Sequence, residues 1–228
     1  MTPDNLQKIL KIKFKNPDLL MTALTHRSYL NEHSDYRLDH NERLEFLGDA
    51  VLELIVTDYL YRNYPNPEGE LTNWRAALVR GATLKEVALV LHLGQYINLS
   101  KGEILSGGRE RELIMANTVE ALIGAIYIDR GIKYASQFIH KYIITRLPQI
   151  LAQHLYQDAK SRLQEKSQEK LNLTPTYYLI SQSGPDHAKQ FVMGVKIGDN
   201  EYGQGSGLSK QEAEQNAAAE ALSKWEEK

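Results

Sequence analysis

Three acidic residues in one short segment have the types and the spacing of a metal-binding cluster. The segment runs from His40 to Asp49, and within it Glu42, Glu45 and Asp49 stand three and four residues apart. On an α-helix these carboxylates project from one face. Neighbouring carboxylates raise one another's pKa, and the partner that usually relieves their repulsion is a divalent cation bound through oxygen. The spacing therefore suggests metal-assisted attack on a phosphate.

An acidic stripe at helical spacing is also typical of a solvated helix face. The residues between and beyond the acids favour the metal site, because they make the segment apolar nearly all round, as in a buried helix. These residues are Leu44, Phe46, Leu47, Ala50, Val51, Leu52, Leu54, Ile55 and Val56. A buried carboxylate needs a partner. We therefore expect this helix to be buried and its acids to face a cation.

Composition limits the kind of metal and the kind of partner. The chain has 228 residues, of which 42% are hydrophobic, so it can form one large domain or two smaller ones. It has no cysteine, which excludes disulfides and thiolate sites and favours Mg²⁺ or Mn²⁺ over structural zinc. The net charge of -2 does not indicate a nucleic-acid binder, so any such binding must be local.

The chain shows no membrane or secretion signal. No apolar run approaches the roughly 20 residues that span a bilayer. The first residues, Met1 to Asn5, lack the charged and then apolar order of a signal peptide. We expect a cytoplasmic protein with no membrane partner.

The hydrophobic pattern changes near residue 156. Helical spacing is predicted for Leu6–Phe14, Leu19–Ser28, Leu44–Tyr61, Leu71–Leu91, Ile114–Tyr127 and Tyr134–Leu155. Beyond Asp158 the pattern predicts a helix over Ala159–Lys170, strands at Pro175–Ile180, Phe191–Ile197 and Glu201–Gly203, and a helix over Ser209–Trp225. We therefore expect an α+β protein of two domains, with helices over residues 1–155 and an α-β-β-β-α order over residues 158–228.

Two stretches resemble the signature sequences of the ribonuclease III family. One is the acidic segment from His40 to Asp49, and the other runs from Asn117 to Gly124 in the matching order; Ser106–Gly108 and Pro67–Glu70 also fit. The tail resembles a double-stranded-RNA-binding domain. The resemblance implies an all-α endonuclease domain followed by that domain. It also implies a homodimeric, Mg²⁺-dependent endoribonuclease that processes rRNA and mRNA precursors, leaving 5′-phosphate and 3′-hydroxyl ends.

The resemblance also assigns roles to the acids. It makes Glu45, Asp49, Asn117 and Glu120 the metal ligands, Asp49 and Glu120 central to catalysis, and Glu42 and Glu68 accessory acids near the phosphate. The spacing independently agrees, because Asn117 and Glu120 share a helix face and two helices can each offer a pair of oxygen ligands. We expect Mg²⁺ with Mn²⁺ as a substitute, and no nucleotide cofactor; a second ion about 3.5–4 Å away would share the charge.

One position departs from the family pattern. The family usually has aspartate where this chain has Asn117, and an amide keeps an oxygen ligand but loses a negative charge. We interpret this as weaker or altered metal dependence. A catalytically impaired double-stranded-RNA-binding protein of the same fold is the alternative, and a structural ribosome-associated relative is a third. Neither has any use for an acidic cluster facing a polyanion.

Other residues near the cluster receive mostly structural interpretations. The resemblance makes Phe46 a dimer anchor that enters a socket on the partner subunit. Glu53 extends the acidic stripe, but the family motif gives it no role, and we interpret it as structural. His26 and His40 are interpreted as structural histidines.

In the tail, the resemblance predicts five RNA contacts. They are Ser161, Gln164 and Glu165 on the first helix, His187 in a loop, and Lys210 at the start of the last helix. A plain solvated helix face would show the same spacing. The tail has nine Lys or Arg against eleven Asp or Glu, a net 9 − 11 = −2, which indicates few phosphate contacts. The glycine-rich stretch Gly203–Lys210 lacks the ending of a nucleotide-binding loop, so we reject that function for it.

Overall fold

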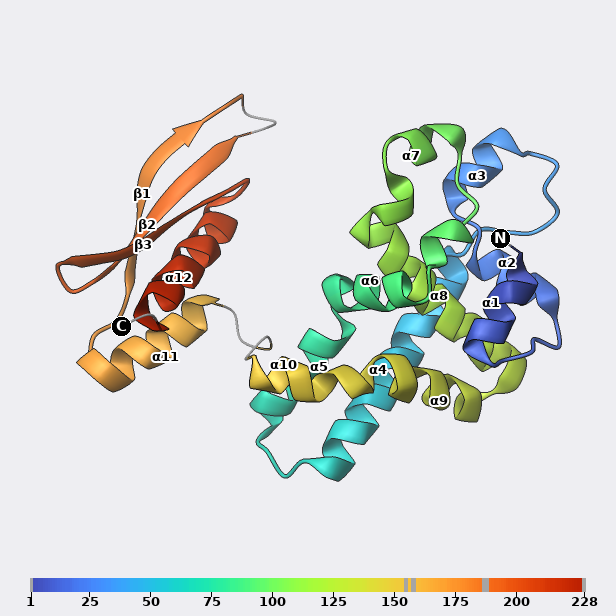
Figure 1. Cartoon of the computed structure of the whole chain (residues 1–228), viewed down its shortest axis with the longest axis horizontal. Coiled ribbons are helices and arrows are strands. Elements are labelled where there is room, and N and C mark those ends of the chain that lie inside the picture. Colours follow the sequence, from blue (N-terminus) through green and yellow to red (C-terminus); the bar gives the residue numbers. More distant parts are fainter. Residues whose placement is uncertain (1, 154–155, 157–158, 186–188, 227–228) are drawn as a thin grey trace. The chain divides into compact units, whose positions relative to one another are not determined.

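The computed structural model describes residues 2–153, 156, 159–185 and 189–226. It divides into two compact units, residues 1–156 and 157–228 (Figure 1). The first unit is helical and the second has the order α-β-β-β-α, which confirms the expected α+β fold class.

The first unit contains α1 (Pro3–Leu10), α2 (Pro17–Ala23), α3 (Arg27–Glu32), α4 (Glu42–Asn63), α5 (Glu68–Val79), α6 (Gly81–Val90), α7 (Lys101–Leu105), α8 (Glu112–Arg130), α9 (Ile132–Tyr142) and α10 (Leu147–Ala152). Short 3₁₀ turns lie at Leu93–Gln95, Gly108–Glu110 and Ile144–Arg146. The most buried of these helices is α8, with most of its length in the core, because it is apolar on nearly every side.

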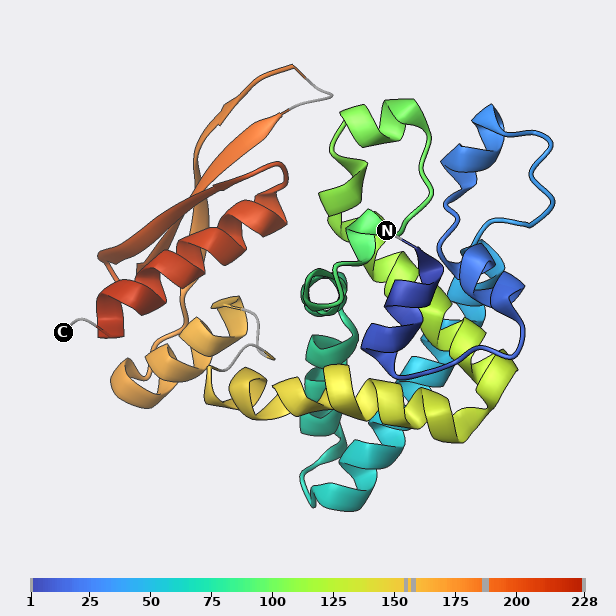
Figure 2. The same cartoon turned by 45° about the vertical axis from the view of Figure 1, so that its right-hand side comes forward.

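Helix α4 crosses α8 at a point where both have glycine. A Cβ atom on Gly48 would lie 1.8 Å from the carbonyl oxygen of Glu120, and one on Gly124 would lie 2.2 Å from that of Leu44. The two backbones therefore touch, which any side chain would prevent. Both views show the two helices side by side in the unit (Figure 1, Figure 2).

The expectation that α4 is buried all round is wrong. Phe46, Leu54 and Tyr61 are 81%, 62% and 79% exposed. Ala50 and Thr57 are also exposed. With them the three residues follow one another at intervals of three or four, so all five form one continuous stripe along the helix. Apolar residues occur on both faces of α4, but only the face toward α8 is covered within this chain.

Four other predicted helices are shorter than expected. The span Leu19–Ser28 is divided between α2 and α3, because the helix ends at Ala23 and the next begins at Arg27. The span Leu71–Leu91 is two helices, because Arg80 has an extended backbone with ψ 152° between α5 and α6. Helix α1 ends at Leu10, since Lys11 adopts a left-handed conformation with φ 57°. The span Tyr134–Leu155 is α9, a 3₁₀ turn and α10.

The second unit contains α11 (Ala159–Leu171), β1 (Thr176–Ser183), β2 (Gln190–Ile197), β3 (Asn200–Gly207) and α12 (Lys210–Glu226). The strands form an antiparallel sheet in the order β1-β2-β3. The third strand is longer than expected and includes Gly203–Gly207 of the glycine-rich stretch. A Cβ atom on Gly205 would lie 2.2 Å from the backbone nitrogen of Ala217, so the glycines allow α12 to pack directly on the strand.

In the described part of the chain, no helix is both long and apolar enough to cross a membrane.

We predict that Gly124→Ala lowers the free energy of unfolding by about 1–3 kcal/mol, because the new methyl group forces α4 and α8 apart. Urea unfolding measures the difference. Gly69→Ala is the matched control: it is also a helical glycine but has open space around its Cβ position, so it should be neutral or stabilising. Equal behaviour of the two variants would contradict the backbone contact.

Candidate active site

The crossing of α4 and α8 brings together the four residues that the sequence placed on two helices. Glu45 and Asp49 come from α4, and Asn117 and Glu120 come from α8. The Asn117 amide hydrogen-bonds to Glu45, and the charges of Asp49 and Glu45 both act on Glu120. We call these four residues the acidic cluster.

The acidic cluster is electrostatically strained. Burial, followed by the charges of Asp49 and Glu45, raises the pKa of Glu120 to about 7. Burial also raises the pKa of Glu45; the Asn117 hydrogen bond opposes this rise, whereas the charges of Glu42 and Asp49 add to it. Among the described residues, no lysine, arginine or histidine forms an ion pair with Glu45, Asp49 or Glu120. A divalent cation bound among these carboxylates would relieve their repulsion.

The donor atoms fit a hard divalent cation. Three carboxylates and one amide offer only oxygen ligands, the type that Mg²⁺ and Mn²⁺ prefer. Over the described ranges, no three or more acidic or imidazole side chains are already arranged to hold a metal. The fit is therefore one of ligand type and charge, and the side chains must rotate inward to coordinate an ion.

Glu42 lies next to the acidic cluster and has a partner that the sequence did not reveal. Its carboxylate is 3.3 Å from the Arg27 guanidinium and 3.8 Å from Nδ1 of His40. His26 caps α3, because its Nδ1 accepts the N–H of Ser28 at 3.2 Å, and Arg27 is the next residue. Arg27 belongs to a different helix from Glu42, so no spacing rule could have linked the two.

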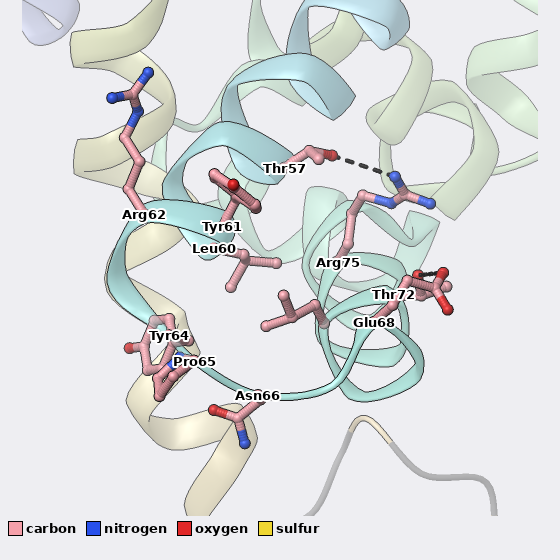
Figure 3. Close-up of a pocket in the computed structure, with 11 residues that line it drawn as sticks. Thr57, Leu60, Tyr61, Arg62, Tyr64, Pro65, Asn66, Glu68, Thr72 and Arg75 are labelled. Carbon is pink, nitrogen blue, oxygen red and sulfur yellow. Dashed lines mark hydrogen bonds between the residues drawn. The ribbon is translucent and has the colours of Figure 1, made fainter.

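The structure does not bring Glu68 to the acidic cluster within one chain. Its carboxylate accepts a hydrogen bond from the Thr72 hydroxyl at 2.9 Å, on the first turn of α5. Figure 3 shows Glu68 on the wall of a cavity of about 790 Å³ that also includes Tyr61 and Arg75. The cavity lies at the far end of α4, roughly 16 Å along the helix from Asp49.

Phe46 and Glu53, which the sequence also singled out, are both on the surface of α4. Phe46 is exposed at the near end of the stripe and borders a second cavity of about 680 Å³ that includes Leu19 and Ile128. Glu53 is exposed and lies outside the acidic cluster.

Four of the five predicted RNA contacts lie in the described part of the second unit. Ser161, Gln164 and Glu165 are exposed on one face of α11 and line a shallow hollow with Gln168 and Glu169. Lys210 is exposed at the start of α12. His187 lies outside the described residues.

An acidic side chain already occupies the start of α12. The Ser209 hydroxyl accepts the N–H of Glu212 at 3.1 Å, and the Glu212 carboxylate accepts the N–H of Leu208 at 2.7 Å. This reciprocal capping satisfies backbone donors that a phosphate would otherwise meet. It leaves the Lys210 ammonium as the main attraction for an anion there.

Comparison with known proteins identifies both units. The ribonuclease-III-like family model matches residues 16–147, and the double-stranded RNA binding motif matches residues 159–224. The chain belongs to the ribonuclease III family. Ribonuclease 3 of Clostridium tetani is 47% identical over 97% of this chain and 94% of that protein. Ribonuclease 3 of Carboxydothermus hydrogenoformans is 45% identical over 96% and 93%.

A solved structure supports the same assignment for the first unit. The nuclease domain of ribonuclease III from Campylobacter jejuni matches with a TM-score of 0.59 and 38% identity, covering 64% of this chain and 99% of that one. The family resemblance inferred from two short stretches is thus confirmed over nearly the whole chain.

The strain in the acidic cluster predicts a pH-dependent stability. The folded-state pKa of Glu120, about 7, lies above its ordinary value of 4.5, so stability is lost as the pH rises through this interval. Without metal, Glu120→Gln should therefore stabilise the protein at about pH 8, by ~1–2 kcal/mol after allowance for solvent screening. The gain should vanish near pH 5.

Urea unfolding in EDTA at the two pH values measures this effect, and Glu53→Gln, an exposed acid of α4, is the control. A gain for Glu120→Gln that is the same at both pH values would contradict the role of ionisation.

Proposed function

We propose that this chain is an endoribonuclease that cleaves double-stranded RNA by metal-assisted hydrolysis, leaving 5′-phosphate and 3′-hydroxyl ends. Precursors of rRNA and mRNA in the cytoplasm are the proposed substrates. The observation that carries the proposal is the acidic cluster, whose uncompensated charge would repel an RNA backbone unless a cation were bound. Membership of the ribonuclease III family and the RNA-binding motif of the second unit support the same function.

The residues of the acidic cluster have different proposed roles. Mg²⁺, or Mn²⁺ in its place, would supply a bound water of lowered pKa and would neutralise charge that develops on the phosphate. Asp49 on α4 and Glu120 on α8 would hold the ion, and Glu45 and Asn117 would complete the ligand set. Because the pKa of Glu120 is about 7, metal binding near neutral pH would be coupled to release of the proton from this carboxyl group. Glu42 lies at the edge of the cluster, where an accessory acid would face the phosphate.

The exposed stripe of α4 supports a homodimer. If two copies pack their stripes antiparallel about a two-fold axis near Leu54, Phe46 of one copy lies opposite Tyr61 of the other. The cavity of Figure 3, which Tyr61 and Leu71 line, is then a socket for that phenyl ring. The same pairing moves Glu68 of one copy toward the acidic cluster of the other. The Campylobacter jejuni nuclease domain is itself described as having a region involved in dimer formation.

The second unit would hold the duplex. Ser161, Gln164 and Glu165 form one exposed face of α11 that suits contacts with 2′-hydroxyls across a minor groove. Lys210 would meet phosphates, and we keep His187 as the proposed loop contact.

Asp49→Asn tests the proposed function. We expect cleavage of a long RNA duplex in Mg²⁺ to fall by about 100-fold or more, because a charged ligand is lost, whereas duplex binding in EDTA should be unchanged. Gel-based cleavage and filter binding measure the two properties. The matched control is Glu53→Gln on the same helix, which should cleave normally. Full cleavage by Asp49→Asn at saturating RNA would refute the assignment.

Asn117→Asp tests the position that departs from the family pattern. The added charge should lower the Mg²⁺ concentration for half-maximal cleavage by roughly tenfold, corresponding to about 1–3 kcal/mol of ligand binding. Mn²⁺ should help the Asn117 protein more than the aspartate variant. Identical metal titrations would show that residue 117 is not a ligand. If only the aspartate variant cleaves, the chain is instead an impaired RNA-binding protein.

Phe46→Glu tests the dimer. A carboxylate cannot enter an apolar socket without a partner, so sedimentation should show monomers at concentrations where the unaltered chain dimerises. Leu105→Glu changes an equally exposed residue that is not on α4 and should leave the dimer intact. A dimeric Phe46→Glu protein would exclude Phe46 as the anchor.

A further inference from the structure

The segment Lys8–Lys15 is the strongest concentration of positive charge in the chain. These eight residues include four lysines and no acidic residue, in a protein whose net charge is -2. All four lysines are exposed. We call Lys8, Lys11, Lys13 and Lys15 the lysine strip.

Burial of the intervening residues aims these lysines outward. Ile12 and Phe14 are only 7% and 4% exposed and join the core of the first unit, while Lys11, Lys13 and Lys15 alternate with them. Such alternation is typical of an extended chain, in which every second residue lies about 6–7 Å further along. Lys11, Lys13 and Lys15 therefore form a row of outward-facing cations, and Lys8 precedes them on the last turn of α1.

The backbone beneath the strip is firmly attached. The two carboxylate oxygens of Asp129 accept the N–H groups of Lys15 and Asn16, both at 2.8 Å. The side-chain oxygen of Gln7 accepts the N–H of Phe14 at 2.8 Å, and the Arg130 guanidinium donates to the carbonyl of Lys13. A row of cations held in this way loses little conformational entropy when it binds.

The ammonium groups of the strip have no acidic partners. Within the ranges that the structure describes, none of the four forms an ion pair, and the adjacent Asp129 uses both oxygens on backbone donors. An unpaired row of cations is an electrostatic footprint for a polyanion.

Cations of the second unit are less available. Three of its lysines contact acids: Lys160 with Glu214 at 2.6 Å, Lys196 with Glu201 at 3.7 Å, and Lys224 with Glu220 at 3.0 Å. Each of these three ammonium groups is partly neutralised by its acidic neighbour and so adds less to the salt-dependent attraction between this unit and RNA. The lysine strip could add to this attraction. Its backbone is held by Asp129, which lies nine residues after Glu120 on α8, roughly 14 Å along the helix.

We propose that the lysine strip binds the phosphates of an RNA duplex beyond the point of cleavage. The contact is with the backbone and reads no sequence, so it adds affinity and orientation to any duplex long enough to reach both the strip and the acidic cluster. This inference rests on the proposed function, since it takes double-stranded RNA as the ligand.

The test neutralises three lysines together in the full-length protein, as Lys11→Gln/Lys13→Gln/Lys15→Gln. For a long RNA duplex in EDTA, the slope of log affinity against log salt should become shallower by about 2–3, and affinity at low salt should fall roughly tenfold or more. In Mg²⁺, KM should rise with little change in kcat. The charge-preserving control, Lys11→Arg/Lys13→Arg/Lys15→Arg, should behave as the unaltered chain, and Lys85→Gln should change neither slope nor KM.

The outcomes separate this inference from the proposed function. If the triple Lys→Gln variant cleaves normally and its slope of log affinity against log salt is unchanged, the proposed role of the lysine strip is overturned and the proposed nuclease function is not. Duplex binding that depends on the strip, in a chain that does not cleave, supports the strip and overturns the nuclease. Loss of binding to phosphatidylserine vesicles with unchanged duplex binding assigns the strip to a membrane surface and overturns the proposal.

Discussion

The direct contact between the backbones of α4 and α8 is the constraint on which the rest of the first unit depends. Gly48 and Gly124 permit an approach that no other residue could. Because the helices touch there, Glu45 and Asp49 on α4 lie close to Asn117 and Glu120 on α8. The same glycines that pack the core therefore also set the separation of the four oxygen donors.

Packing and electrostatics oppose each other at this crossing. Close helix packing excludes water, and exclusion of water raises the cost of charge on Glu120 and Glu45. Ionisation of these partly buried carboxylates is thus unfavourable in the folded protein without metal. A bound cation would convert this cost into affinity, since the ligands are already collected and partly desolvated. Asn117 moderates the cost, because its amide donates to Glu45 instead of adding a fourth charge.

Several surface features of the chain gain a purpose only when another molecule is considered. The stripe of α4 exposes apolar area that a second copy could cover, and the cavity near Glu68 lies at the end of that stripe. The lysine strip forms no ion pair within the described residues, whereas three lysines of the second unit, Lys160, Lys196 and Lys224, lie beside acidic side chains. A duplex bound by such a protein would meet positive charge away from the acidic cluster and a metal within it.

The sequence alone determined the fold class, the change of pattern near residue 156, the family and the membership of the acidic cluster. These follow from local periodicity, because a spacing of three or four residues states which side chains share a helix face. Periodicity does not state what that face meets. Only the tertiary structure decided that one side of α4 is exposed, that Arg27 pairs with Glu42, that Glu68 lies far from Asp49, and that the glycines of β3 admit a helix. Each of these depends on contacts between segments distant in sequence, which no local pattern encodes.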